Sequence, residues 1–544
     1  MFALLDSLFP LEDVSIGARF LWRLPSFLRH PISAEQAKVT LRRRLERREG
    51  NFMALARQAI YAHAASPYRQ LLNLAGCEYG DLERLVGQEG VEGALRTLYR
   101  QGVYLTVDEF KGRRPAVRGN ATIEVEPDRL RNPLSAIHVS ARSSGSRGSG
   151  TPVGIDFAHI GDCSVNQCLT LDARGGIEWR HANWGVPGGG AMVELLRLIH
   201  FGARPVRWFS QLDPATPGLH PRYRWSARLM RWGGRLTGVA LPRPQYVPLE
   251  SPLPIVQWMK EVLREGRVPH LLTFASSAVR LCQAALDARL DLRGVQFWVG
   301  GEPVVEARMA VIRGAGAQAT PAYGTSESGL IGDGCLAPEA ADDLHFFHDS
   351  HALIQSGPDG ERTGLPPLAL LISSLRPTAP LILLNASLGD QAVLVRRACN
   401  CPLERLGWDT HLHTIRSFEK LTAGGMTFLD TDVIRVLDEV LPVRFGGAPT
   451  DYQLVEEQGD NGHVRLQLLV HPRVGPLDTD MVVEAFLTAI AHGSGVERVM
   501  GLLWREARFL RVERGVPRIT ASGKILHLHV ERRPSAQAAS HPPA

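Results

Sequence analysis

The sequence predicts an α/β protein of two domains, and three observations lead to that prediction. The chain has 544 residues, which is more than one ordinary hydrophobic core can organise. Through its middle part, short runs typical of buried strands alternate with helical stretches, as in layered α/β proteins. From near Arg416 onward the pattern changes to a compact set of strands and helices, which indicates a smaller second domain.

The predicted elements follow one another along the chain with clear start and stop signals. Apolar residues at spacings of three and four before a glycine predict helices over 52–76. Later segments predict, in order, a buried strand ending in two glycines (295–301), a helix (306–317), a strand running into a loop (319–329), two elements of the second domain (430–442 and 463–472) and a disordered tail (533–544).

Composition excludes several classes of protein. With 44% hydrophobic and 22% charged residues the chain is typical of globular proteins, and no apolar run reaches the roughly 18 to 20 residues of a membrane helix. A formal charge of +5 is small for this length, and no nucleic-acid-binding module is recognisable. The arginine-rich segment 41–50 interleaves glutamates at helical spacing, which predicts a solvated helix face.

The two other general features are the opening segment and the cysteines. Residues 1–50 start with an apolar stretch that lacks the basic start of a secretory signal, so we expect a helical extension that packs on its own domain. A helix resting on a membrane surface is the alternative. The seven cysteines are an odd number and mostly lack paired spacing, which argues against a disulfide framework and favours a cytoplasmic protein.

Five motifs carry the chemistry. A run of glycines and hydroxyl residues spans 143–152 and suits either a flexible linker or a loop that wraps a phosphate. Gly300–Val304 follows a predicted strand, and Tyr323–Gly329 places an aromatic ring, a hydroxyl and a carboxylate within a few residues. Asp390 ends the segment "LGD", and Lys524 lies in "PRITASGKI", which predicts a tight turn.

In this order and spacing the motifs resemble the adenylate-forming superfamily, which includes acyl-CoA synthetases, peptide-synthetase adenylation domains and luciferases. The "SE" of "YGTSESG" and the cysteines near residue 400 look most like the phenylacetate-CoA ligase branch and its acyl-protein synthetase relatives. The resemblance implies a large N-terminal adenylate-forming domain of layered sheets and helices, here residues 51–415. It also implies a smaller, mobile α+β C-terminal domain, here 416–532, which carries the catalytic lysine.

The resemblance implies binding sites for ATP and Mg²⁺ in the large domain. Glu327 would hold magnesium, and Ser326 would touch the phosphate or acyl oxygens. Asp390 would accept both ribose hydroxyls. The remaining nucleotide contacts would come from the loop residues Ser143, Ser144, Gly145, Ser146 and Gly148, from the wall residues Gly300, Gly301 and Glu302, and from Tyr323, Gly324 and Thr325, with the Tyr323 ring stacked on adenine.

Two residues of the small domain complete the expected site. Arg416 would begin the second domain and reach the ribose, and Lys524 would bridge the substrate carboxylate and the α-phosphate during adenylation. The chain departs from the family pattern at Phe418, where many members have an aspartate or lysine hinge. Either Glu419 serves after a one-residue shift or the hinge is unusual.

Cysteines and histidines indicate a second metal. Thiolates and imidazoles are ordinary ligands of a closed structural zinc site, and the resemblance places Cys335, His345, Cys399 and Cys401 there. His345 is preferred to His348 because "LH" matches the branch pattern. The alternative is a set of reduced, buried thiols without metal.

The expected function is ATP-dependent activation of a small carboxylic acid as its acyl-adenylate, with release of pyrophosphate. The acyl group would then pass to a thiol, with coenzyme A as the first expectation. The phosphopantetheine of an acyl carrier protein or a cysteine of a partner such as an acyl reductase is the alternative acceptor. A non-catalytic homologue that binds nucleotide is the rival of another class, favoured by Phe418 and by Arg147 in the phosphate loop.

Overall fold

The computed structural model describes residues 11–142, 151–213, 222–357, 363–418, 422–423, 426–427, 431–458, 464–491, 510–520 and 522–531. The chain divides into two compact units, and the division falls between Ile415 and Arg416. Among the residues that the structure describes, none of the helices combines the length and the apolar character that a membrane span needs.

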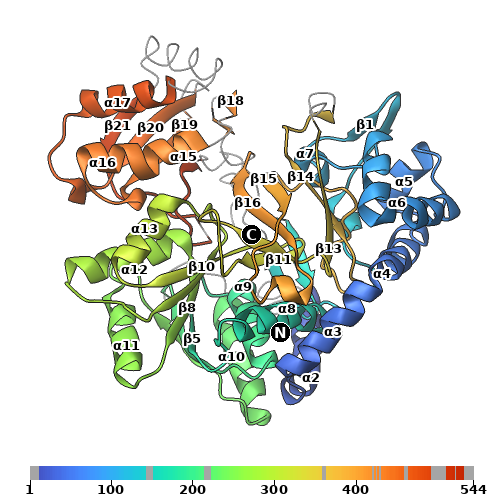
Figure 1. Cartoon of the computed structure of the whole chain (residues 1–544), viewed down its shortest axis with the longest axis horizontal. Helices are drawn as coiled ribbons and strands as arrows, with labels where there is room; N and C mark the ends of the chain where they lie inside the picture. The colour runs from blue at the N-terminus through green and yellow to red at the C-terminus, as the bar shows by residue number, and fades with distance from the viewer. Residues whose placement is uncertain are drawn as a thin grey trace, which may run out of the picture. The chain divides into compact units, whose positions relative to one another are not determined.

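Helices form the first part of the first unit (Figure 1). Ser33 caps the second of them, because its side chain accepts a hydrogen bond from the Gln36 N–H while the Gln36 side chain accepts one from the Ser33 N–H. The helices are α2 (Leu11–Arg29), α3 (Ala34–Glu46), α4 (Arg48–Leu55) with the π-helical turn η1 (Ala56–Tyr61), α5 (Pro67–Leu74), α6 (Tyr79–Arg100) and α7 (Val107–Phe110).

A ten-stranded sheet organises the rest of the first unit, in the order β15-β16-β12-β11-β10-β9-β8-β5-β6-β7. From β10 to β7 all neighbouring strands are parallel, whereas β11 is antiparallel to both β10 and β12. The strands are β5 (Arg180–Gly185), β6 (Pro205–Ser210), β7 (Pro244–Tyr246), β8 (Pro269–Phe274), β9 (Gln296–Gly300), β10 (Gln318–Thr325), β11 (Gly329–Gly334), β12 (Leu344–Phe346), β15 (Asp390–Arg396) and β16 (Thr410–Ser417).

Successive side chains of the parallel strands point to opposite faces of this sheet, so each strand contributes to two cores. On β9, Phe297 and Val299 join one hydrophobic cluster with α11 (Leu253–Arg264), α12 (Ala275–Asp287) and α13 (Glu306–Gly314). Trp298 packs on the opposite face, against the cluster that contains α8 (Phe157–Asp172), α9 (Gly189–His200) and α3. The result is the helix–sheet–helix layering that the alternating pattern predicts.

Shorter elements complete the first unit. Three two-stranded ribbons lie outside the large sheet, and β3 and β4 pair on either side of residues 143–150. The elements are β1 (Ala116–Arg118), β2 (Ala121–Ile123), η2 (Pro127–Leu130), β3 (Val139–Arg142), β4 (Pro152–Ile155), α10 (Arg222–Leu236), β13 (His351–Gln355), β14 (Leu370–Ser374) and η3 (Glu404–Leu406).

The second unit is built on a four-stranded sheet in the order β21-β20-β19-β22, with β19 and β20 antiparallel. Phe486 and Leu454 are among its fully buried side chains. Its elements are β17 (Thr422–Ala423), β18 (Met426–Thr427), α15 (Thr431–Arg435), η4 (Val436–Val440), α16 (Leu441–Phe445), η5 (Pro449–Asp451), β19 (Tyr452–Gln458), β20 (Val464–Val470), η6 (Pro472–Val474), α17 (Thr479–Ala491), β21 (Leu510–Arg514) and β22 (Leu528–Glu531).

Candidate functional site

The turn from Thr325 to Gly329 joins β10 to β11 and carries the residues that the sequence assigns to magnesium and phosphate. The hydroxyl of Thr325 accepts a hydrogen bond of 3.1 Å from the Ser328 N–H, and the two hydroxyl oxygens are 2.9 Å apart. Gly329 has a φ of 83°, and a Cβ at this position would lie 2.7 Å from the His159 ring. Only glycine therefore allows the turn to pack this closely on α8.

Tyr323 and Asp390, which the sequence assigns to adenine and ribose, are in direct contact. The Tyr323 hydroxyl donates a hydrogen bond of 3.0 Å to Asp390 Oδ2. Tyr323 lies near the end of β10, and Asp390 is the first residue of β15. Burial, together with the neighbouring carboxylates of Asp390 and Glu327, raises the pKa of Tyr323 well above its ordinary value, so its hydroxyl remains a donor.

Glu327 is the candidate magnesium ligand, and its surroundings fit that role. Its side chain is 6% exposed, and within the described parts of the chain no hydrogen bond reaches its carboxylate. Buried carboxylates normally have a donor. A hard divalent cation would take the place of that donor because it prefers oxygen ligands. Ser326, the residue before it, is half-buried in the same turn.

The wall predicted from Gly300, Gly301 and Glu302 begins at the last residue of β9. The Glu302 carboxylate is fully buried and bound within the protein. It accepts hydrogen bonds of 2.8 Å from the Ser276 N–H and 2.9 Å from the Ser276 hydroxyl, and it lies 3.2 Å from the Arg308 guanidinium. These contacts fasten the β9–α13 loop to the N-terminus of α12. A contact of Glu302 with nucleotide stays a prediction. Because its carboxylate is engaged within the protein, we expect the backbone of Glu302 to make this contact.

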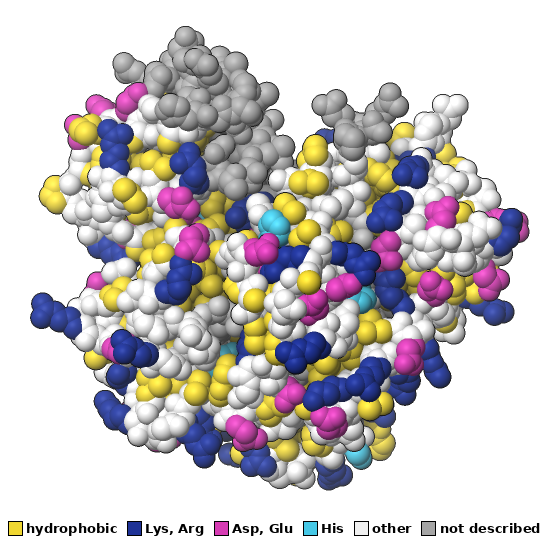
Figure 2. All heavy atoms as spheres, in the orientation of Figure 1, with side chains coloured by type: hydrophobic (Ala, Val, Ile, Leu, Met, Phe, Trp, Pro, Cys, Tyr) yellow, Lys and Arg dark blue, Asp and Glu magenta, His cyan; other side chains and the backbone are white. Residues whose placement is uncertain are grey.

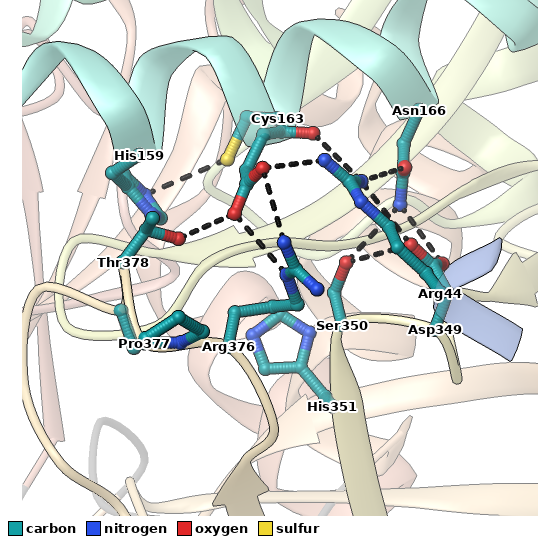
Figure 3. Close-up of polar contacts among 12 residues, drawn as sticks. Arg44, His159, Cys163, Asn166, Asp349, Ser350, His351, Arg376, Pro377 and Thr378 are labelled. Atoms are coloured by element: carbon teal, nitrogen blue, oxygen red, sulfur yellow. Dashed lines mark hydrogen bonds and ion pairs between the residues drawn. The ribbon is translucent and has the colours of Figure 1, made fainter. Parts of the chain in front are cut away.

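A buried charged network lies beside α8 and near the turn (Figure 3). Arg44 is 2% exposed and forms ion pairs of 2.5 Å with Asp162 and 3.4 Å with Asp349. Arg376 reaches Asp162 from the other side at 3.2 Å. Burial alone would raise the pKa of Asp162, but the two arginines hold it below its ordinary value. The predicted solvated face of segment 41–50 is therefore wrong for Arg44, although Arg42 and Arg43 are exposed.

Three side chains outside the sequence motifs, those of His351, His159 and Cys163, lie against the turn from Thr325 to Gly329. The Nε2–H of His351 donates a hydrogen bond of 3.1 Å to the Ser328 carbonyl, and burial lowers the pKa of His351 to about 4, so the ring is neutral. Cys163 Sγ lies 3.5 Å from His159 Nε2, and both belong to α8 (Figure 3). No local pattern could have identified these residues, because each meets the turn through the tertiary fold alone.

The remaining predicted residues fall in three places. The loop residues Ser143, Ser144, Gly145, Ser146 and Gly148 lie outside the described residues. Arg416 is buried on β16, at the first position of the second unit. Lys524 is half-buried on a turn in which its N–H donates 3.0 Å to the Thr520 hydroxyl and its carbonyl accepts 2.9 Å from the Thr520 N–H. The roles of all these residues stay predictions.

Cysteine and histidine side chains converge at the other end of β11. Ligand atoms of Cys335, His345, Cys399 and His411 all lie within 4.8 Å of one another. Cys401 is adjacent, with its Sγ 3.1 Å from His345 Nε2. The sequence predicted Cys335, His345, Cys399 and Cys401 and missed His411, which stands opposite His345 across the β12–β16 pair.

Both histidines of this cluster are held through the nitrogen that faces away from the thiols. His345 Nδ1 donates 2.6 Å to the Trp408 carbonyl, and His411 Nδ1 lies 2.8 Å from Asp343 Oδ1. His411 Nε2 is buried and has no hydrogen-bond partner within the described ranges. Such carbonyl and carboxylate partners commonly orient metal-binding histidines, so the donor set fits a zinc ion.

The Asp343 carboxylate keeps its charge beside the cluster. Burial alone would raise its pKa, but hydrogen bonds from His411, the Glu339 N–H and Arg397 outweigh burial and lower it to about 2. Burial lowers the pKa of His345 to about 4, which leaves its ring neutral, the form that binds metal.

Comparison with solved structures shows that the chain shares its fold with 2-hydroxyisobutyryl-CoA ligase. The chain is similar to 2-hydroxyisobutyryl-CoA ligase in the postadenylation state. For its complex with 2-HIB-AMP the TM-score is 0.53 at 15% identity, with 94% of this chain and 92% of that chain covered. For its complex with R3-HIB-AMP the TM-score is 0.52 at the same identity and coverage. No protein-family model and no curated protein sequence matches the chain.

Proposed function

We propose that this chain is an AMP-forming acid:thiol ligase that activates a small carboxylic acid with ATP and transfers the acyl group to coenzyme A. The observation that carries the proposal is the meeting of Tyr323, Asp390 and Glu327 in one place within this fold. An aromatic ring, a carboxylate for the ribose and a buried carboxylate that has no donor among the described residues are the groups expected to hold a nucleotide with its cation. The 2-hydroxyisobutyryl-CoA ligase structures hold an acyl-adenylate, which supports the same chemistry here.

In the first half-reaction a carboxylate oxygen of the acid attacks the α-phosphorus of ATP, and pyrophosphate leaves. Tyr323 and Asp390 position the nucleoside, so the attacking and leaving oxygens can approach an in-line arrangement. The Lys524 ammonium stabilises the negative charge that grows on the α-phosphate and the incoming carboxylate. Magnesium held by Glu327 would supply further neutralisation of the phosphate oxygens.

In the second half-reaction the thiol sulfur attacks the acyl carbonyl carbon, and AMP leaves with the bonding electron pair. The thiol proton is lost to the surroundings, and the product is a thioester. Coenzyme A is the proposed acceptor because the 2-hydroxyisobutyryl-CoA ligase that shares the fold is named for that acceptor. An acyl carrier protein or the cysteine of an acyl-reductase partner is the alternative that the same chemistry allows.

We also propose a structural zinc held by Cys335, His345, Cys399 and His411. Their proximity supports it, as does the buried Nε2 of His411, which has no hydrogen-bond partner among the described residues. The cluster agrees with the expected likeness to the phenylacetate-CoA ligase branch, which we retain as part of the proposal. A cytoplasmic location is proposed because all seven cysteines are free thiols.

Pyrophosphate exchange across a panel of carboxylic acids tests the function. Exchange of label between pyrophosphate and ATP that depends on one class of acid is the expected result, followed by thioester formation when coenzyme A is added. Transfer to a phosphopantetheinylated carrier protein and not to coenzyme A would change the acceptor only. ATP binding without exchange for any acid would instead assign the chain to the non-catalytic homologues.

A further inference from the structure

Two helices at the surface of the first unit carry exposed tryptophans among arginines. Trp22 on α2 is 84% exposed, and Trp232 and Leu236 on α10 are 55% and 58% exposed. Tryptophan is rarely left in water to this extent, and the adenylation site uses neither helix. In the orientation of Figure 1, Figure 2 shows basic and hydrophobic side chains along the lower edge, where α2 and α10 lie, with some acidic side chains among them.

The two helices are packed together on one hydrophobic core. A Cβ on Gly233 of α10 would lie 2.6 Å from Leu24 of α2, so the helices approach closely at this point. Leu24 and Met230 are fully buried in the same cluster. Because both buried faces point into that cluster, the opposite faces, which carry Trp22 and Trp232, both point outward.

The outward faces are positively charged. The sequence of α10 contains five arginines and no acidic residue, and α2 from Ser15 onward contains three arginines and no acidic residue. Within the ranges that the structure describes, Arg19, Arg23 and Arg235 form no ion pair. Burial and the nearby positive charges of Arg243 and Arg235 lower the pKa of Arg231.

From this arrangement we infer that the α2–α10 surface binds the face of a bilayer that contains anionic phospholipids. Amphipathic helices with tryptophan and leucine beside arginine lie in the interface plane, where the apolar groups enter the headgroup region and the cations meet the phosphates. Anionic lipids supply negative charges opposite Arg19, Arg23 and Arg235, which form no ion pair among the described residues. The inference does not depend on the proposed ligase activity.

Vesicle co-sedimentation of the full chain tests this inference. Vesicles of phosphatidylcholine alone are compared with vesicles in which about a third of the lipid is phosphatidylglycerol. We expect binding to the anionic vesicles, weak binding to the neutral ones, and loss of binding as salt is raised from about 0.1 M to 0.5 M, because salt screens the charges. Equal binding to both kinds of vesicle, or to neither at low salt, would overturn the inference.

Two double variants, each with a matched control, distinguish binding by this surface from nonspecific adsorption to vesicles. The double variant Arg19→Glu and Arg235→Glu should weaken partitioning into anionic vesicles at least about tenfold. Its control is the double variant Arg293→Glu and Arg396→Glu, which should change partitioning little. These two control positions lie elsewhere on the chain and are 86% and 77% exposed. Trp22→Ala with Trp232→Ala should weaken partitioning several-fold and remove part of the fluorescence blue shift on binding. The control for that pair is Leu74→Ala with Val117→Ala.

Two further outcomes would contradict the inference. Equal losses in the test and control variants would show that net charge or general hydrophobicity, and not this surface, causes binding. Binding to the soluble polyanion heparin with none to vesicles would assign the arginines to another kind of partner. Because Trp22 and Trp232 are exposed, we expect the alanine variants to fold normally, and an unchanged melting temperature checks this directly.

Discussion

The hydroxyl of Tyr323 donates a 3.0 Å hydrogen bond to Asp390, a residue 67 positions later in the chain. One partner comes from the end of β10 and the other from the start of β15, so the contact exists only in the folded sheet. It joins the two side chains that are expected to hold the base and the sugar of one nucleotide.

Mutation of Tyr323 and mutation of Asp390 should have different effects on stability and on the KM for ATP. Tyr323→Phe keeps the ring that is proposed to stack on adenine and loses one partly buried hydrogen bond. We therefore expect a loss of about 1 kcal/mol in unfolding free energy and little change in the KM for ATP. Asp390→Ala should raise the KM for ATP at least about tenfold, because it removes the proposed acceptor of the ribose hydroxyls. Denaturant titration and pyrophosphate exchange measure the two effects. Similar KM values for the two variants would contradict the assignment of Asp390 to ribose.

Glu327→Gln should impair magnesium use much more than folding. The carboxylate is buried without a protein donor in the described residues. Its neutral isostere therefore removes the proposed cation ligand and breaks no hydrogen bond that the structure shows. We expect the exchange rate to fall strongly and to recover partly at high Mg²⁺, with a melting temperature near that of the wild type. A drop in melting temperature that parallels the loss of activity would place Glu327 in the core instead.

In contrast to Glu327→Gln, Glu302→Gln should lower the stability of the protein much more than it affects ATP use. Arg308 is 2% exposed and would lose its carboxylate partner, and breaking a buried ion pair in this way typically costs about 3 kcal/mol. We expect a clear fall in unfolding free energy with a nearly unchanged KM for ATP in the protein that remains folded. A raised KM at full stability would show that the carboxylate itself contacts the nucleotide.

Lys524→Ala separates the two half-reactions. In the proposed role, the Lys524 ammonium stabilises charge on the α-phosphate and the carboxylate during adenylation only, so acid-dependent pyrophosphate exchange should fall roughly a hundredfold or more. ATP binding should persist, because the nucleotide residues proposed in the first unit are unchanged. Transfer from a pre-made acyl-adenylate to the thiol should suffer much less. Equal loss in both half-reactions would make Lys524 a structural residue.

Metal analysis tests the cysteine and histidine cluster. Protein purified without added metal should contain near one zinc per chain. Cys399→Ser and His411→Ala should lose the metal, whereas Cys401→Ser should retain most of it, because Cys401 lies outside the set of four that share one centre. The soluble fraction of each variant is compared, so that poor folding is recognised. A metal-free wild type of full stability would leave the cluster as buried thiols and imidazoles.

Local backbone rules made part of this protein predictable from its sequence. The strand over 295–301, the helix over 306–317 and the strand that runs into a loop over 319–329 follow from local sequence patterns and glycines, and they occur as β9, α13 and β10. The turn that presents Lys524 likewise depends on residues within five positions of one another. In each case the interactions that set the structure lie inside the segment that was inspected.

Side-chain partners across the fold could not be predicted in this way. Arg44 belongs to a segment with the pattern of a solvated face, yet Asp162 and Asp349 bury it. His411 joins the cysteine cluster because β16 pairs with β12 and places it opposite His345. Sequence alone determined which residue types and turns were available. Only the tertiary structure decided which of them meet, because burial and ion pairing depend on contacts between segments that lie tens to hundreds of residues apart.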